Sequence, residues 1–310
     1  MSRALFIVNP DAGRKEGEAM SRAATSVLGS AFDCVDRRVS SSAADVLRWA
    51  RQAREEHCDA LVVMGGDGTA SLGLRGVLDG AADDDELPAL CVLPGGTGNG
   101  FVRTLGIGPD AAAAVRAYDF SRTVPLDVCS VNGNPFVYSV TGGPLPEGIR
   151  AVPSETKSRF GVFAYMASEL SRVGNGNRHV LRIAVDGEQR VETVSSFVAF
   201  SANALVNDFT SIPKTRLDDG HLYFMALRSA SLPALLSLVP RVFSRSLERS
   251  RQVLLLQGSS IEVESLDGDL RCGIDGDDGP FTPISLRIDR GKMRMFAVDA
   301  PQGGRFPARE

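Results

Sequence analysis

The chain has 310 residues, of which 43% are hydrophobic and 23% charged, and its formal net charge is -4. These values are ordinary for a globular protein of about two domains, and they exclude disordered and fibrous classes. A small negative net charge argues against general nucleic-acid binding, so we expect no nucleic-acid partner.

Up to about residue 124, apolar runs alternate with helical patterns. Strands are expected at 4–8, 31–38, 60–64 and 89–93, and helices at 16–28, 43–57, 69–79 and 110–118. This alternation predicts a parallel sheet covered by helices, which is a Rossmann-like α/β nucleotide domain over residues 1–124.

After Val124 the pattern changes to strand-like runs separated by Asn-Gly and Asp-Gly pairs. Their spacing predicts a C-terminal antiparallel β-sandwich domain over residues 125–300, with helical interruptions near 161–173 and 232–245. The tail 301–310 has no periodicity and is expected to be flexible.

The five cysteines are scattered and form no C-x-x-C pair, which predicts free thiols in a reducing compartment. The N-terminal residues lack the pattern of a secretory signal, and no run approaches the ~18 apolar residues of a transmembrane helix. We therefore expect a cytoplasmic protein.

The most informative motif is the apolar strand 60–64 followed by Gly65-Gly66-Asp67-Gly68-Thr69. Glycines allow the backbone to approach a phosphate, and the helix that follows presents unpaired N–H groups. A carboxylate would repel phosphate, so Asp67 is expected to take a ribose hydroxyl or a Mg²⁺ ion. The alternative is an ordinary tight turn in which Asp67 caps its helix.

Two further strand ends have similar loops. Strand 89–93 runs into Pro94-Gly95-Gly96-Thr97-Gly98-Asn99-Gly100, and strand 4–8 is followed by Asn9-Pro10, with Arg14 and Lys15 behind. Loops of successive βα units meet at one sheet edge, so one nucleotide cleft is expected. For the two cations the alternative is a solvated start of a helix. The candidate nucleotide-binding residues are Asn9, Arg14, Gly65, Gly66, Asp67, Gly68, Thr69, Gly96, Thr97 and Asn99.

These three motifs together resemble the diacylglycerol kinase catalytic domain, as found in bacterial soluble lipid kinases and sphingosine kinases. The resemblance covers about residues 3–299 and includes Leu126-Asp127-Val128, the segment 160–165, Leu217-Asp218-Asp219-Gly220 and Ile274-Asp275-Gly276-Asp277. It implies an ATP-dependent, Mg²⁺-requiring kinase that phosphorylates a hydroxyl of a diacylglycerol-like or sphingoid lipid.

The resemblance also implies roles for single carboxylates. Asp277 occupies the position of an acid that activates the lipid hydroxyl, and Asp219 that of a structural Mg²⁺ ligand. For both motifs a plain hairpin turn is the alternative. Asp127 is expected to organise a hydrated Mg²⁺ with Asp67. Gly100 departs from the pattern, because the lipid kinases usually have Asp there.

Other functions stay open. An NAD kinase shares the Gly-Gly-Asp-Gly-Thr motif, and Gly100 together with Asp277 suggests a nucleotide-binding regulatory protein with little turnover. The apolar segment 232–243, followed by arginines, is either a helix resting on the inner membrane face or a core helix. The oligomeric state is not fixed by the sequence, and a dimer is compatible with it.

Overall fold

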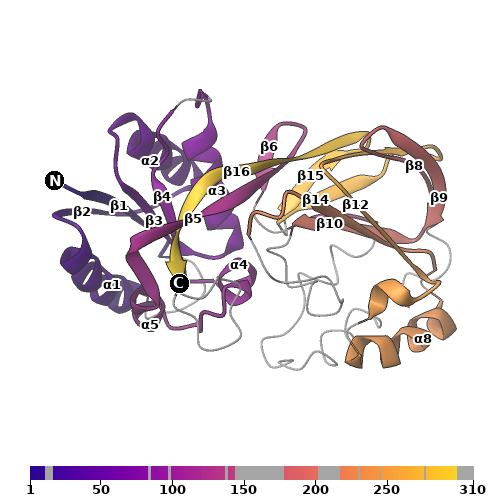
Figure 1. Cartoon of the computed structure of the whole chain (residues 1–310), viewed down its shortest axis with the longest axis horizontal. Coiled ribbons are helices and arrows are strands. Elements are labelled where there is room, and N and C mark those ends of the chain that lie inside the picture. Colours follow the sequence, from indigo (N-terminus) through magenta and orange to yellow (C-terminus); the bar gives the residue numbers. More distant parts are fainter. Residues whose placement is uncertain are drawn as a thin grey trace.

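The computed structural model shows two lobes joined by long strands (Figure 1). It describes residues 1–10, 17–82, 85–96, 99–136, 139–143, 178–201, 217–229, 231–244, 246–275 and 277–298. The predicted tail 301–310 and the predicted helix at 161–173 lie outside these residues.

The first lobe is built on a parallel sheet in the order β2-β1-β3-β4. Helices α2 and α3 pack together on one face, and α1 and α5 pack together on the other (Figure 1). The strands are β1 (Arg3–Val8), β2 (Cys34–Val39), β3 (Ala60–Gly65) and β4 (Ala89–Pro94). The helices are α1 (Gly17–Ala31), α2 (Ala43–Glu55), α3 (Asp67–Leu78), α4 (Gly100–Thr104) and α5 (Ala111–Arg116).

The central strands of this sheet are covered on both faces, which explains their uninterrupted apolar sequences. Every residue of β3 and of β4 is buried. The predicted Rossmann-like domain is therefore confirmed.

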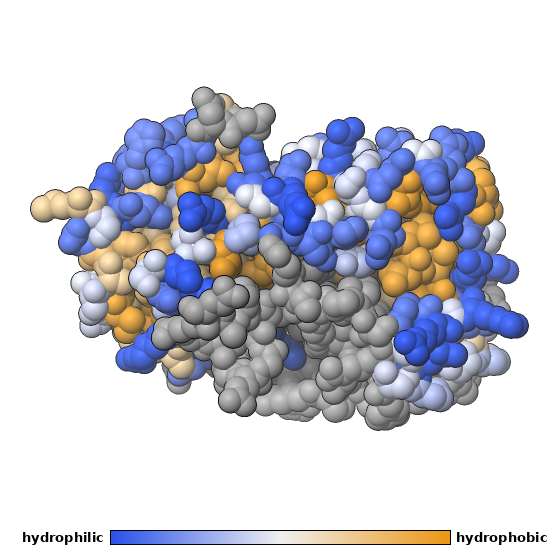
Figure 2. All heavy atoms as spheres, in the orientation of Figure 1, coloured by the Kyte–Doolittle hydropathy of each residue, from blue (hydrophilic) through white to orange (hydrophobic). Residues whose placement is uncertain are grey.

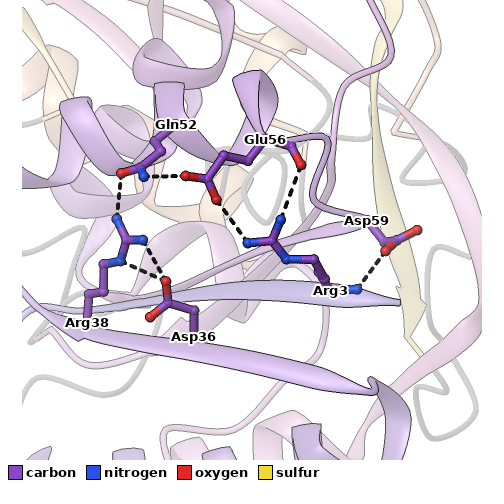
Figure 3. Close-up of polar contacts among 6 residues, drawn as sticks. All are labelled: Arg3, Asp36, Arg38, Gln52, Glu56 and Asp59. Carbon is purple, nitrogen blue, oxygen red and sulfur yellow. Dashed lines mark hydrogen bonds and ion pairs between the residues drawn. The ribbon is translucent and has the colours of Figure 1, made fainter. Parts of the chain in front are cut away.

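A chain of polar contacts fastens α2 to the outer strands of the sheet (Figure 3). Arg38 on β2 donates to Asp36 and to Gln52 on α2, and Gln52 donates to Glu56, the C-cap of α2. Arg3 on β1 completes the chain through an ion pair of 2.9 Å with Glu56. The hydrogen bond from Gln52 and the contact with Arg3 lower the pKa of Glu56. Charged residues in the edge strand thus hold it to the helix that covers it.

The second lobe contains two sheets whose inner faces share an apolar core. Phe136, Phe197 and Phe224 are among the largest fully buried side chains of that core. One sheet has the order β12-β11-β10-β7-β14-β15, and the other continues the first-lobe sheet as β16-β13-β8-β9. The predicted antiparallel sandwich is confirmed. The elements are β5 (Tyr118–Val131), β6 (Asn134–Phe136), β7 (Ser139–Gly142), β8 (His179–Val185), β9 (Glu188–Val194), β10 (Ser196–Ser201), β11 (Leu222–Leu227), α8 (Leu232–Phe243), a 3₁₀ turn (Leu247–Arg249), β12 (Val253–Gly258), β13 (Ser260–Ser265), β14 (Arg271–Ile274), β15 (Asp277–Phe281) and β16 (Ile284–Val298).

Two long antiparallel strands, β5 and β16, run through both lobes (Figure 1). The end of β16 lies parallel to β4, with Met295 opposite Leu90. Met293, Met295 and Phe296 are buried in the core of the first lobe. The C-terminal strand therefore extends the N-terminal sheet next to β4. The domain boundary at residue 124 stays a prediction.

Helix α8 buries Ala234 and Leu238 and exposes Pro233, Ser237 and Pro240. This burial supports the interpretation of 232–243 as a core-packing helix. Within the described part of the chain, no helix is long and apolar enough to cross a membrane.

Candidate functional site

The two glycine loops meet backbone to backbone at the carboxyl edge of the first-lobe sheet. The N–H of Gly95 donates to the carbonyl of Gly65 over 2.9 Å. A methyl group on Gly96 would lie 2.6 Å from the Cα of Gly66, and one on Gly95 would lie 2.9 Å from the Cα of Gly65. A side chain at Gly95 or Gly96 would therefore clash with the backbone of the other loop, which explains the glycine pair of the second loop.

Side chains of the neighbouring strand ends hold the loops in place. The Asn9 amide donates to Thr69 Oγ1 over 3.0 Å, which ties the end of β1 to α3. Asn99 has a left-handed backbone, with φ of 48°, and its amide both accepts from and donates to the backbone of Gly96. Asn9, Gly95 and Gly96 line a small pocket at this edge.

Asp67 lies at the first turn of α3, but its carboxylate caps a different helix. Its two oxygens accept the N–H groups of Gly100 and Phe101, over 2.8 and 2.9 Å. These are the first amides of α4, where a negative charge is stabilised by the helix dipole. The alternative in which Asp67 caps its own helix is not observed, because the N-cap there is Gly66. A contact of Asp67 with ribose or Mg²⁺ stays a prediction.

Asp127 is buried where β5 passes between the lobes. One oxygen accepts the N–H of Gly220 and the other that of Gly291, each over 2.7 Å. Gly291 lies in an irregular stretch of β16 opposite Asp127, and both glycines have positive φ. Burial raises the pKa of Asp127, the two amides oppose that shift, and the nearby carboxylate of Asp219 adds to it.

The structure thus brings Asp127 and Asp219 near each other. Asp219 accepts hydrogen bonds from the His221 N–H and the Tyr223 hydroxyl. Among the side chains that can be placed, no group of three or more His, Cys, Asp or Glu could hold a metal ion. The two carboxylates supply negative charge in a partly buried place, which suits a cation, but they form no closed ligand set.

Asp277 belongs to the second lobe and lies next to a nucleotide loop of the first. It begins β15, opposite Ile274 of β14. A methyl group on Gly68 would lie 3.5 Å from Asp277 Oδ2, so this carboxylate faces the first turn of α3. The neighbouring acids are engaged elsewhere, since Asp278 pairs with Arg271 over 3.0 Å and Asp275 accepts the Ser139 N–H.

Most candidate residues therefore surround one edge of the first-lobe sheet. Arg14 and Thr97 lie outside the described residues. Sequence reasoning missed the tie between Asp67 and α4, and also the roles of Gly220 and Gly291. The sequence signal for Gly220 and Gly291 was a glycine at each turn, but nothing local linked these glycines to Asp127.

Two family models match the chain. The diacylglycerol kinase catalytic domain matches residues 3–131, and the "YegS C-terminal NAD kinase beta sandwich-like domain" matches residues 148–297. A diacylglycerol kinase of Staphylococcus aureus strain RF122 is 27% identical, over 93% of this chain and 90% of that protein. A diacylglycerol kinase of Staphylococcus carnosus is 25% identical, over 92% and 91%.

Solved structures share the fold. A crystal structure of a diacylglycerol kinase from Bacillus anthracis superposes with a TM-score of 0.72 at 20% identity, covering 96% of this chain and 97% of that one. The likeness extends over both lobes.

Proposed function

Since the chain belongs to the diacylglycerol kinase catalytic domain family, we propose that this kinase transfers the γ-phosphate of ATP to a hydroxyl of a diacylglycerol-like or sphingoid lipid. One observation carries the proposal: the Asp277 carboxylate of the second lobe faces Gly68 in the glycine loop of the first. A base that faces a phosphate-binding loop is what a transfer to a hydroxyl requires.

The nucleotide half consists mainly of backbone. The turn at Gly96 lines the pocket and lies against Gly66, the N-cap of α3, and helix N-termini favour phosphate. Asn9 and Asn99 fix the loops through the contacts with Thr69 and Gly96. In this proposal Arg14 and Thr97 add a cation and a hydroxyl to the phosphates.

Asp277 acts as the general base that accepts the proton of the acceptor hydroxyl. It is exposed, and no hydrogen bond or ion pair engages its carboxylate within the described chain, unlike Asp278 with Arg271. A carboxylate free of partners at the edge of the loop can approach an acceptor oxygen.

The acceptor half is supported by an apolar face in the second lobe. Val198, Phe200 and Tyr223 are buried in a cluster of their own, separate from the sandwich core. Phe200 pairs with Ser139 of β7, which in turn is bonded to Asp275 in the hairpin of the proposed base. Hydrophobic residues also reach the surface of this lobe beside α8 (Figure 2). Because of these surface residues, the proposal also includes peripheral contact of the second lobe with a membrane.

Mg²⁺ would be held by Asp219 with backbone carbonyls, and Asp127 lies next to it. When bound, such an ion supplies positive charge near the phosphates or stabilises the turn. If Mg²⁺ binds at Asp219, the melting temperature should be higher in Mg²⁺ than in a chelator. Asp219→Asn should remove that difference.

An NAD kinase is the second candidate, because the model matching residues 148–297 names NAD kinase in its description. The test is transfer of label from γ-labelled ATP to vesicles containing diacylglycerol or a sphingoid base, beside NAD in solution. Label in lipid supports the proposal. Label in NAD alone overturns it, and nucleotide binding without any transfer supports a regulatory protein.

A further inference from the structure

Three hairpins of the second lobe are tied to a third strand in the same way. Each has two residues between its strands, and the first of them is an Asn or Asp with a left-handed backbone, which these residues tolerate. Its N–H donates to the carbonyl of a serine on the third strand, and its side chain accepts the N–H of the same serine. The pairs are Asn132 with Ser285, Asp186 with Ser260, and Asp275 with Ser139, at φ of 50°, 49° and 51°.

At Asp275 this tie extends the ladder between β7 and β14 by one residue. Val140 lies opposite Ile274, and beyond them the Asp275 N–H donates to the Ser139 carbonyl over 2.8 Å. In a regular ladder the Ser139 N–H would bond to the backbone carbonyl of Asp275 in return. Here it donates to Asp275 Oδ1 over 2.9 Å. The carboxylate therefore takes the place of a backbone acceptor where the chain turns away from β7.

The position of β15 depends on this turn. β15 is the last strand of the six-stranded sheet, and β14 is its ladder partner among the described strands. The ion pair of Arg271 with Asp278 also joins the two strands, but both side chains are more than half exposed, so it contributes little. Asp277 begins β15 and is exposed. The backbone of the hairpin therefore sets the place of its carboxylate opposite Gly68.

We propose that Asp275 is a positioning residue for the base: by holding Ser139, its carboxylate fixes the hairpin so that Asp277 faces the glycine loop. This inference rests on the proposed kinase function. The same contact joins the hairpin to the apolar face of the second lobe, because Ser139 lies opposite Phe200 of that face. Asp275 thus sets the position of the base relative to the face on which the lipid acceptor would lie.

The negative charge of Asp275 is not needed for this role, because Asn132 makes the same tie with an amide oxygen. Asp275→Asn keeps both the acceptor and the left-handed turn, so it should phosphorylate lipid at close to the original rate. Asp275→Gly keeps the turn, since glycine adopts positive φ, but removes the acceptor. Its kcat should fall about tenfold or more, because a small misplacement of a reacting group is costly. The KM for ATP should stay unchanged.

Asp186→Gly is the matched control. It removes the same tie from the hairpin of β8 and β9, which lies at the outer end of the second lobe (Figure 1). It should lower the melting temperature about as much as Asp275→Gly does and leave the transfer rate unchanged. Hydrogen exchange at the Ser139 amide should become faster in Asp275→Gly and stay slow in Asp275→Asn, because the amide oxygen still accepts that N–H.

A double variant tests whether Asp275 acts through Asp277. In an Asp277→Asn background, adding Asp275→Gly should cause no further loss of transfer, because the group that it positions is already gone. If the original chain phosphorylates no lipid, the proposed function fails and this assignment fails with it. If the original chain does phosphorylate lipid, three results would overturn the assignment alone: the original rate in Asp275→Gly, an equal loss in Asp186→Gly, or a further loss in the double variant.

Discussion

Asp67 shows how one carboxylate can fix the start of a helix beside a glycine loop. It holds the amides of Gly100 and Phe101, so Asp67→Ala should cost about 1 kcal/mol of unfolding free energy, as loss of a helix cap does. Because α4 follows directly on the second glycine loop, nucleotide affinity should also fall. Thermal unfolding and nucleotide titration measure the two effects.

Asp110 offers the matched control, since it caps α5 by accepting the N–H groups of Ala112 and Ala113. Asp110→Ala should cost similar stability and leave nucleotide affinity unchanged. Equal loss of affinity in both variants would show that the effect of Asp67 comes from general destabilisation.

At the residue scale, sequence reasoning found the groups that lie at strand ends and missed their partners. Asn9, Gly66 and Gly96 are positioned by the strand that precedes each of them. The capping of α4 by Asp67 depends on residues 33 and 34 positions away, and α4 is only 5 residues long. Helices that short give no periodic signal.

The glycine loops form a contact between two elements that tolerates no side chain. Gly96→Ala would place a methyl group 2.6 Å from the Cα of Gly66, so the loops must separate. We expect a loss of about 1–3 kcal/mol in stability and loss of nucleotide binding. Gly29→Ala in α1 meets nothing within 4 Å and should leave binding intact. Normal nucleotide affinity in Gly96→Ala would contradict this account.

The polar chain between α2 and the sheet predicts a pH dependence. The pKa of Glu56 is lowered in the fold from its ordinary value of 4.5, so its stabilising effect is present above that value and disappears as pH falls through the lowered pKa. Glu56→Gln should lower the melting temperature at neutral pH and match the original chain in stronger acid. Glu55→Gln, at an exposed neighbour, should show no such difference at either pH.

Elements with a clear period were predicted well because burial repeats along them. The alternation of β1, α1, β2, α2, β3 and α3 follows directly from apolar spacing. Pairing between distant strands produces no such periodic pattern in the sequence. Nothing in residues 284–298 indicates that their last part pairs with β4, because a buried strand has the same apolar pattern in either sheet.

At the scale of the whole molecule, Asp127 holds Gly220 and Gly291 in place where β5 and β16 pass from one lobe to the other. Asp127→Ala leaves the amides of Gly220 and Gly291 without their acceptor, which should cost about 1–3 kcal/mol. Hydrogen exchange at these two amides should become faster. Asp289→Ala, an exposed acid opposite Val128 on the same crossing, should change neither. Unchanged exchange in Asp127→Ala would contradict the fastening role.

The most direct test of the proposed kinase site compares Asp277→Asn with Asp278→Asn in the labelled-ATP assay on lipid vesicles. Asp277→Asn should reduce transfer by about 10² to 10⁴, as loss of a general base does, while nucleotide affinity stays unchanged. Asp278→Asn removes an adjacent carboxylate and should stay close to the original rate. Equal rates in the two variants would contradict the assignment of Asp277 as the base.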